Sequence, residues 1–342
     1  AGVRSLSKTL LVTGGSGFIG SNFVRYYLNR YPDDRIINLD KLTYAGNPAN
    51  LSDFDDDDRY RFVHGDICDV ELVESLVADC DGVFNFAAES HVDRSILGGA
   101  EFVQTDVYGT YVLLEAARKH EVERFHQIST DEVYGSLTEG AWDEGFPMEP
   151  RNPYSASKAS AEMLVRAYHI THGLQTVVTR ASNNIGPYQY PEKRVPLYIT
   201  NAIDDQPLPV YGNGLQIRDH LFVDDHCSAI DLVFHEGVAG EAYNVGGENE
   251  ANGVEVARAI LDQLGKPESL LQFVEDRAGH DQRYALNSGK VRQLGWQPAV
   301  DTEESMRRTI QWYVDNESWW RDIKASDDYL AYYKRQYGER LK

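Results

Sequence analysis

The fold is decided by one stretch near the start of the chain, Lys8-Thr9-Leu10-Leu11-Val12-Thr13-Gly14-Gly15-Ser16-Gly17-Phe18-Ile19-Gly20. Its first six residues predict a short buried strand, and apolar residues recur at helical spacing from Phe18 to Leu28. Glycines at 14, 17 and 20 permit a tight turn, close approach of the backbone to a pyrophosphate and close packing of helix on sheet. We therefore expect a strand, a glycine turn and a helix whose N-terminus binds the phosphates of a dinucleotide.

The next predicted strand indicates which dinucleotide is bound. Residues 35–40 predict a strand that ends at Asp40, where an acid hydrogen-bonds the ribose of NAD. No arginine adjoins Asp40, which favours NAD over NADP, although Lys41 leaves NADP open.

The alternation of strands and helices predicts the fold class. Further strands are expected at 60–67, 83–88, 124–129 and 176–180, and helices at 70–77 and about 99–120. This order predicts an α/β fold: a Rossmann-type doubly wound parallel sheet with a smaller, mixed α/β C-terminal substrate domain. We expect residues 8–184, joined by 221–246, to form the NAD-binding domain and residues 185–342 to form mainly the substrate domain.

Composition excludes several classes of partner. The net charge of −21 disfavours nucleic acid and anionic membranes, and no apolar run is long enough to span a bilayer. Three cysteines without metal-ligand spacing, and no signal-peptide pattern, predict reduced thiols in a cytoplasmic protein without a metal. The acidic surface suits either a high-salt environment or an ordinary acidic enzyme.

A group of chemically capable residues follows the predicted strand 124–129. Thr130, Asp131 and Glu132 come first, and a helix opened by Pro153 carries Tyr154 and Lys158 on one face at i and i+4. An adjacent ammonium lowers the pKa of a phenol, so this pair predicts a hydride-transfer site behind a nucleotide-binding half. The same residues could instead form a surface Tyr/Lys pair and a solvated acidic loop.

The glycine turn and the Tyr-x-x-x-Lys pair resemble the extended branch of the short-chain dehydrogenase/reductase family. Within it, Thr-Asp-Glu-Val-Tyr-Gly at 130–135 resembles the nucleotide-sugar 4,6-dehydratases, and the likeness covers roughly residues 8–320. The other matching motifs are Asp40-Lys41-Leu42-Thr43-Tyr44-Ala45-Gly46-Asn47, Phe86-Ala87-Ala88-Glu89-Ser90-His91-Val92-Asp93-Arg94-Ser95, Asn183-Asn184, Pro191-Glu192-Lys193 and Gly279-His280-Asp281.

The resemblance implies a lyase reaction on a nucleoside-diphosphate sugar, dTDP-glucose, with NAD as cofactor. Tyr154, assisted by Lys158 and Thr130, would take the proton of the C4 hydroxyl as hydride passes to NAD. Glu132 would then act as base at C5 and protonated Asp131 as acid at C6, before the hydride returns to C6. The expected cofactor contacts are Gly14, Gly17, Phe18, Ile19, Gly20, Asp40, Lys41, Thr43, Asp66, Ile67, Ala87, Ala88, Tyr154 and Lys158.

The resemblance also implies the substrate contacts, with Arg218 and Arg277 on the diphosphate. The others expected are Ser90, His91, Asn183, Asn184, Glu192, Lys193, Pro209, Tyr211, Asn252, His280 and Tyr284. The chain departs from the family pattern at Asp106, Ile185 and His220, of which the last two border the substrate region, so UDP-glucose stays open as the substrate. The activity of a 4-epimerase or a decarboxylase, and the role of a nucleotide-binding scaffold protein, also stay open. A homodimer is implied, packed through the helix after Tyr154 and the long helix before it.

Overall fold

The glycine stretch folds as predicted, with β1 (Thr9–Thr13) turning through the glycines into α1 (Phe18–Arg30). The computed structural model describes residues 7–276, 281–338, 340 and 341. Gly14 has a φ of 68°, which favours glycine. A Cβ on Gly20 would lie 2.3 Å from the carbonyl oxygen of Gly14, so the turn excludes any side chain there.

A seven-stranded parallel sheet forms the larger part of the molecule. Its strand order is β10-β6-β5-β4-β1-β2-β3, and every pairing in it is parallel. The chain runs outward from β1 in one direction and then, from β4, in the other, which confirms the doubly wound fold class. The further strands are β2 (Arg35–Asp40), β3 (Tyr60–His64), β4 (Gly82–Asn85), β5 (Arg124–Thr130), β6 (Thr176–Ala181) and β10 (Ala242–Val245).

Helices cover both faces of this sheet. α1 packs with α8 (Val223–Glu236) on one face, over apolar residues such as Phe23, Phe84 and Phe234. On the other face α2 (Val70–Val77), α5 (Thr110–Lys119) and α6 (Pro153–His172) pack in a row over residues such as Leu11 and Phe125. Alternate residues of each strand therefore enter two different cores, as expected for a sheet buried on both faces.

The long helix expected near 99–120 is divided into three pieces. α4 (Ala100–Phe102) leads into a π-helical turn, η2 (Val103–Gly109), before α5 begins. Such a turn inserts one residue into a helix and often occurs at functional sites. Here it holds Asp106, which is buried.

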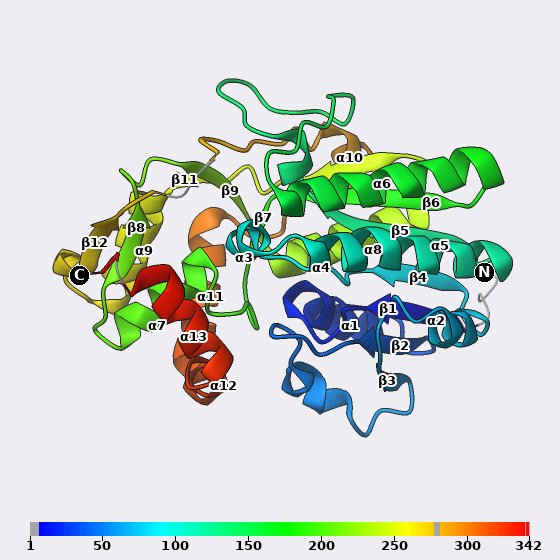
Figure 1. Cartoon of the computed structure of the whole chain (residues 1–342), viewed down its shortest axis with the longest axis horizontal. Helices are drawn as coiled ribbons and strands as arrows, with labels where there is room; N and C mark the ends of the chain where they lie inside the picture. Colours follow the sequence, from blue (N-terminus) through cyan, green and yellow to red (C-terminus); the bar gives the residue numbers. More distant parts are fainter. Residues whose placement is uncertain (1–6, 277–280, 339, 342) are drawn as a thin grey trace.

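The smaller part of the molecule lies at the left of Figure 1 and is mixed α/β, as predicted. Two small sheets have the orders β11-β9-β7 and β12-β8. Their strands are β7 (Asn183–Ile185), β8 (Leu208–Tyr211), β9 (Ile217–Phe222), β11 (Glu250–Asn252) and β12 (Leu271–Val274). The helices here are α7 (Arg194–Ile203), α9 (Gly253–Leu264), α11 (Thr302–Asp315), α12 (Glu317–Lys324) and α13 (Asp327–Tyr337). The short elements elsewhere are η1 (Pro48–Phe54), α3 (Val92–Leu97), η3 (Asp131–Tyr134), η4 (Glu268–Leu270) and α10 (Gly289–Gln293).

α13 ties the smaller part to the larger one. Arg94 on α3 forms an ion pair with Asp328 at 3.2 Å, and the Gln336 side chain donates to Asp93 at 3.2 Å. Trp320 on α12 is fully buried, which agrees with the packing role of this aromatic segment. Among the described residues, no helix is long and apolar enough to cross a membrane.

Candidate active site

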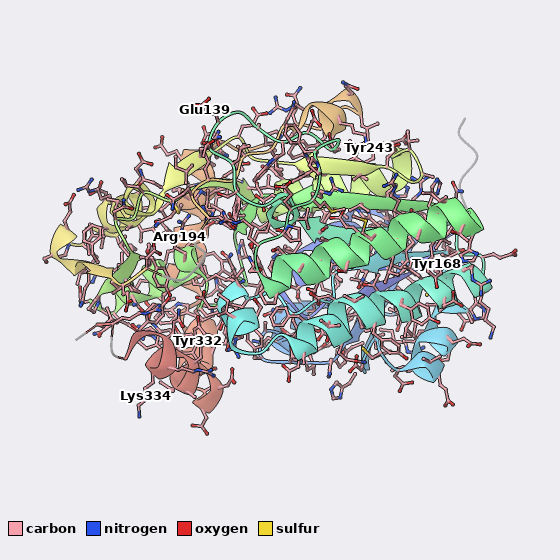
Figure 2. The ribbon with its side chains drawn as sticks, turned by 45° about the horizontal axis from the view of Figure 1, so that its top comes forward. Glu139, Tyr168, Arg194, Tyr243, Tyr332 and Lys334 are labelled. Carbon is pink, nitrogen blue, oxygen red and sulfur yellow. The ribbon has the colours of Figure 1, made fainter. Side chains whose placement is uncertain are left out.

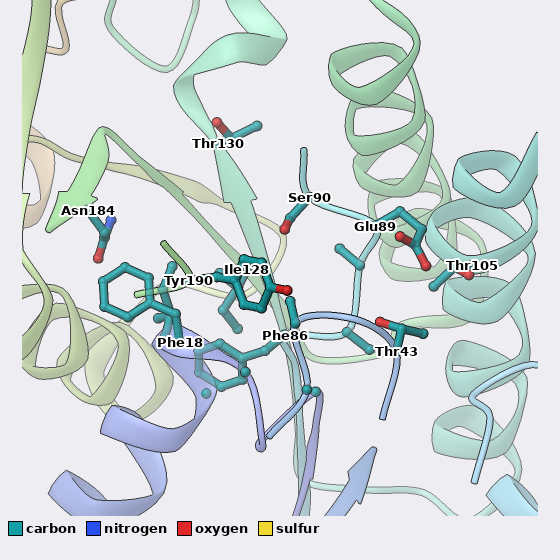
Figure 3. A pocket seen from close by; sticks show the side chains of 18 of the residues that line it. Phe18, Thr43, Phe86, Glu89, Ser90, Thr105, Ile128, Thr130, Asn184 and Tyr190 are labelled. Atoms are coloured by element: carbon teal, nitrogen blue, oxygen red, sulfur yellow. The ribbon is translucent and has the colours of Figure 1, made fainter. Parts of the chain in front are cut away.

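A cavity of about 290 Å³ lies at the carboxyl ends of the central strands (Figure 3). Ligands of doubly wound sheets bind at this edge, where the strand order reverses. Thr130 lies at the end of β5 in this view, with Phe18 and Thr43 across the cavity. The cavity is lined by every expected cofactor and catalytic residue: Gly14, Gly17, Phe18, Ile19, Gly20, Asp40, Lys41, Thr43, Asp66, Ile67, Ala87, Ala88, Thr130, Asp131, Glu132, Tyr154 and Lys158.

The glycine turn and the end of β2 together form a cradle that fits a dinucleotide. A Cβ on Gly14 would lie 2.7 Å from the backbone nitrogen of Ala87. The glycine turn after β1 can therefore approach the segment after β4 this closely only because residue 14 has no side chain. Asp40 accepts hydrogen bonds from the backbone N–H groups of Ser16 and Leu42, at 2.9 and 2.8 Å, which fix its carboxylate at the cavity wall. Lys41 forms an ion pair with Asp66 at 2.7 Å, so its charge is already matched by a carboxylate.

The two acids expected to be catalytic follow β5 directly. Thr130 ends the strand and caps η3, and its hydroxyl accepts from the Glu132 N–H at 3.3 Å and donates to Asp131 Oδ1 at 3.2 Å. Burial raises the pKa of Asp131 well above its ordinary value, and the Glu132 and Asp219 carboxyl groups act in the same direction. This direction favours the protonated form of Asp131, the form that can donate a proton. Its Oδ2 is buried and has no hydrogen-bond partner among the described residues.

The sequence also explains how α6 presents Tyr154 and Lys158. Asn152 and Ser155 form a capping box, and Pro153 opens the first turn, so the start of the helix is fixed at the cavity. Lys158 Nζ donates to the carbonyl oxygen of Ile128 at 2.7 Å, which anchors the ammonium beneath the end of β5.

The electrostatics around Tyr154 differ from the sequence prediction. Burial raises the pKa of Tyr154 well above its ordinary value, and the carboxyl groups of Glu132, Asp106 and Asp131 add to this effect. The pKa is therefore shifted opposite to the expected direction, first by burial and then by three nearby acids that could not be counted from sequence. Burial also lowers the pKa of Lys158, while Asp106 and Glu162 raise it.

A second cavity of about 170 Å³ extends into the smaller part of the molecule. Its lining and that of the first cavity have Glu132, Asn183, Asn184, Gln189, Glu192 and Lys193 in common, so the two adjoin. Of the expected substrate contacts, Ser90 lines the first cavity, whereas His91, Pro209, Tyr211, Arg218 and Tyr284 line the second.

The shared residues differ in how firmly the protein already holds them. The Asn184 side chain forms hydrogen bonds with the Ser182 carbonyl oxygen and with His226 Nδ1. Asn183 Oδ1, in contrast, is buried without a hydrogen-bond partner among the described residues. Glu192 is fully buried and forms an ion pair with Arg94 at 3.1 Å. Lys193 Nζ donates to the carbonyl oxygen of Ser90 at 2.7 Å.

One expected contact among the described residues, Asn252, is not found at the wall of either cavity. Asn252 caps α9 by accepting from the backbone N–H groups of Val254 and Glu255, while the adjacent Gly253 lines the second cavity. Arg277 and His280 lie outside the described residues.

Sequence reasoning missed several residues that line the cavities, among them Glu89, Tyr190, Arg194 and Tyr337. Arg194 follows directly on the Pro191-Glu192-Lys193 motif, which was the only local signal for it. Tyr337 is far along the chain from most of the cavity-lining motifs, and nothing in its neighbourhood indicates a site.

Comparison with known proteins places these motifs in a family. Residues 11–309 match the family described as GDP-mannose 4,6 dehydratase. A dTDP-glucose 4,6-dehydratase from Streptomyces niveus is 51% identical over 324 residues, which cover 93% of this chain and 96% of the relative. The low-salt glycan biosynthesis protein Agl12 from Haloferax volcanii is 51% identical over 308 residues, covering 90% and 99%.

A solved structure is similar over nearly the whole chain. The crystal structure of DesIV, a dTDP-glucose 4,6-dehydratase from Streptomyces venezuelae with NAD bound, has a TM-score of 0.91 and 50% sequence identity. The alignment covers 92% of this chain and 100% of that one.

Proposed function

The chain belongs to the GDP-mannose 4,6 dehydratase family, and from this premise we propose that it converts dTDP-glucose to dTDP-4-keto-6-deoxyglucose. It is an NAD-dependent lyase. The observation that carries this function is the buried Asp131, whose pKa is raised by burial, beside Glu132 at the end of β5, in the cavity that Tyr154 and Lys158 also line. Epimerisation at C4 needs no acid to expel the C6 hydroxyl, whereas dehydration does.

The cavity residues fit NAD. Gly14 and Gly20 allow the tight turn that presents backbone to a pyrophosphate, and Asp40 lies at the cavity wall, where it can hydrogen-bond a ribose. Lys41 is the cation that could otherwise bind the extra phosphate of NADP. Its ion pair with Asp66 already balances that charge. When bound, NAD accepts a hydride from the sugar and later returns it.

We assign the proton transfers to five residues of this chain. Tyr154, as its phenolate, removes the proton of the C4 hydroxyl. The hydrogen bond with Thr130 favours that phenolate against the effect of burial, and Lys158 assists it. Once C4 is a ketone the C5 hydrogen is acidic, and Glu132 removes it as Asp131 gives its proton to the departing C6 hydroxyl. Water leaves, the hydride returns to C6, and Glu132 gives its proton back to C5.

The proton count explains why Thr130 lies where it does. Each turnover leaves one extra proton on Tyr154 and removes one from Asp131. The Thr130 hydroxyl is hydrogen-bonded to Asp131 at 3.2 Å, and a Thr130 hydrogen bond also acts on Tyr154. Through the Thr130 hydroxyl, the proton gained by Tyr154 can return to Asp131. Both groups then regain their starting protonation.

The two cavities divide the substrate between them. We assign the sugar to the first cavity near Ser90 and Glu132, and the nucleoside diphosphate to the second, with Asn183, Asn184 and Lys193 at the junction. The unsatisfied Asn183 Oδ1 supports a polar ligand there, because buried polar atoms rarely lack a partner. On this division, residues 8–184 with 221–246 form the NAD-binding domain and residues 185–342 mainly the substrate domain.

We also propose a homodimer. The outer sides of η2, α5 and α6 expose apolar residues; Val103 is 59% exposed, Met163 52% and Ile170 68%. Exposed apolar groups on adjacent helices are typical of an interface. A cytoplasmic location is supported by the three unpaired cysteines, as in a reducing compartment.

The function is tested by incubating the protein with equal concentrations of dTDP-glucose and UDP-glucose. Mass spectrometry should find dTDP-sugar lighter by one water, without accumulation of NADH. An unchanged mass with an inverted C4 centre would mean epimerisation. Neither sugar carries a carboxyl group, so decarboxylation is tested separately, by loss of carbon dioxide from a nucleotide-linked uronic acid. Preferential dehydration of UDP-glucose would keep the chemistry and refute the assigned nucleotide.

A further inference from the structure

Arg194 is the first residue of α7 and lines the second cavity immediately after Lys193. Figure 2 shows it in the smaller part of the molecule. Its Nη2 lies 3.1 Å from Nε2 of His220 on β9. The first turn of α7 thus presents a guanidinium to the small sheet that forms the opposite wall.

The contact defines the state of His220. A guanidinium only donates hydrogen bonds, so Nε2 must accept, and the ring is neutral with its proton on Nδ1. Burial lowers the pKa of His220 to about 3, and the positive charges of Arg194 and Arg218 add to this effect. A backbone hydrogen bond involving Asn249 acts in the opposite direction. The imidazole therefore remains an acceptor throughout the working pH range and orients Arg194 without competing for its charge.

A second guanidinium flanks the same imidazole. Arg218 is two residues before His220 on β9, so both side chains lie on one face of the strand. It donates to the carbonyl oxygens of Ile217 and Asp281, at 2.7 and 2.9 Å, and lies over the Tyr284 ring with its Cζ 4.2 Å from the centroid. The carbonyl and ring contacts orient this guanidinium at the wall of the second cavity.

The arrangement gathers positive charge in a protein that carries a net charge of −21. Arg194 and Arg218 approach a neutral buried side chain from two directions, at the wall of a cavity that adjoins the catalytic one. The part of a nucleotide sugar between its sugar and its nucleoside is the diphosphate. Guanidinium forks match phosphate oxygens bidentately, which a sugar hydroxyl or a nucleobase carbonyl does not require.

We propose that Arg194, held in place by His220, is a diphosphate-binding residue that acts together with Arg218. His220 is a positioning residue and does not itself touch the substrate. The inference rests on the proposed function, since it assigns part of the same substrate to a residue outside the expected set.

The test compares binding of dTDP and of thymidine by calorimetry. Arg194→Met should weaken dTDP binding about 10- to 100-fold, the effect of losing a charged hydrogen bond, and leave thymidine binding within twofold. His220→Leu should weaken dTDP binding as well, whereas His220→Gln, which keeps an acceptor, should restore most of it. Arg258→Met on α9 is the control, because it removes the same charge from an exposed site in the same part of the molecule.

The outcomes separate this inference from the proposed function. Unchanged dTDP affinity in Arg194→Met would overturn it, even if the wild-type protein dehydrates dTDP-glucose normally. Equal losses for dTDP and thymidine would also overturn it, by placing Arg194 at the nucleoside. Failure of the wild-type protein to dehydrate dTDP-glucose would refute the proposed function, and the dTDP measurement would still report on Arg194.

Discussion

Replacing Asp106 by Asn should stabilise the protein at neutral pH. Asp106 is 2% exposed on the π-helical turn η2; it accepts from the Glu89 N–H at 2.9 Å and from the Ser157 hydroxyl at 2.6 Å. Burial raises its pKa from 3.8 to about 6, and Lys158 on α6 opposes that rise, while the Glu89 carboxyl group contributes to it. The carboxyl group therefore loses its proton less readily in the folded protein than in the unfolded chain.

The magnitude follows from linkage. Between pH 4 and 6 the folded protein binds more protons at this site than the unfolded chain, so stability falls as pH rises. A shift of about two pKa units costs about 3 kcal/mol above pH 7, and about half of that at pH 5. Asparagine carries no charge, and its amide can still accept from the Glu89 N–H and donate to the Ser157 hydroxyl. That hydroxyl can then donate to the Tyr154 carbonyl oxygen, which lies 2.8 Å away.

Urea unfolding at pH 5 and pH 8 measures the effect. Asp106→Asn should be more stable than the wild-type protein by up to about 3 kcal/mol at pH 8, and by roughly half as much at pH 5. Asp322→Asn, at an exposed position on α12, should change neither value. Equal stability gains at both pH values, or a loss at pH 8, would refute the reasoning.

The same substitution should also affect turnover. Asp106 is one of two acids that raise the pKa of Lys158, so in Asp106→Asn that pKa falls further. If the ammonium form is required, the alkaline limb of the kcat profile should move to lower pH. An unmoved limb would show that Asp106 does not act through Lys158.

Three further predictions concern other parts of the molecule. Glu132→Gln should still reduce bound NAD on mixing with dTDP-glucose but eliminate water at least about 100-fold more slowly, measured by single-turnover absorbance and mass spectrometry; unaltered elimination would remove Glu132 from the mechanism. Gly20→Ala should lower stability by about 1–3 kcal/mol and weaken NAD binding, because its Cβ meets the Gly14 carbonyl oxygen at 2.3 Å; normal NAD affinity by calorimetry would contradict the close approach. Arg180→Met should lower the free energy of unfolding in urea by about 3–5 kcal/mol, because it leaves the Glu162 carboxylate buried without its 2.7 Å partner. As a control, Arg307→Met in the exposed Arg307–Glu304 pair should change it by no more than about 1 kcal/mol.

Local patterns in the sequence were enough to predict the parallel sheet and the first half of the site. The glycine turn, Asp40 and the capped start of α6 are each determined by neighbours a few residues away, and the structure brings their side chains to one cavity. Strand ends were less certain. The strands expected to reach Ile67 and Ala88 end at His64 and Asn85, because ladder partners and not propensity set where pairing stops.

Features made by distant segments were not predictable. The pairing of β7 with β9 brings Asn183 beside His220, and nothing local specifies it. The raised pKa of Tyr154 results from burial within the folded chain, and acids from η2 and η3 add to it. The π-helical turn was likewise invisible, because apolar periodicity continues on both sides of Asp106.

The position of α13 has a consequence for how the protein is made. Synthesis runs from the N-terminus, so the glycine cradle, Thr130 and Tyr154 leave the ribosome long before α13 does. Tyr337 on this helix lines the second cavity, and Asp328 and Gln336 fasten the helix to α3. A nascent chain can therefore form its dinucleotide cradle while the wall around the nucleotide is still incomplete. The order of translation thus separates synthesis of the dinucleotide cradle from completion of the nucleotide-binding wall.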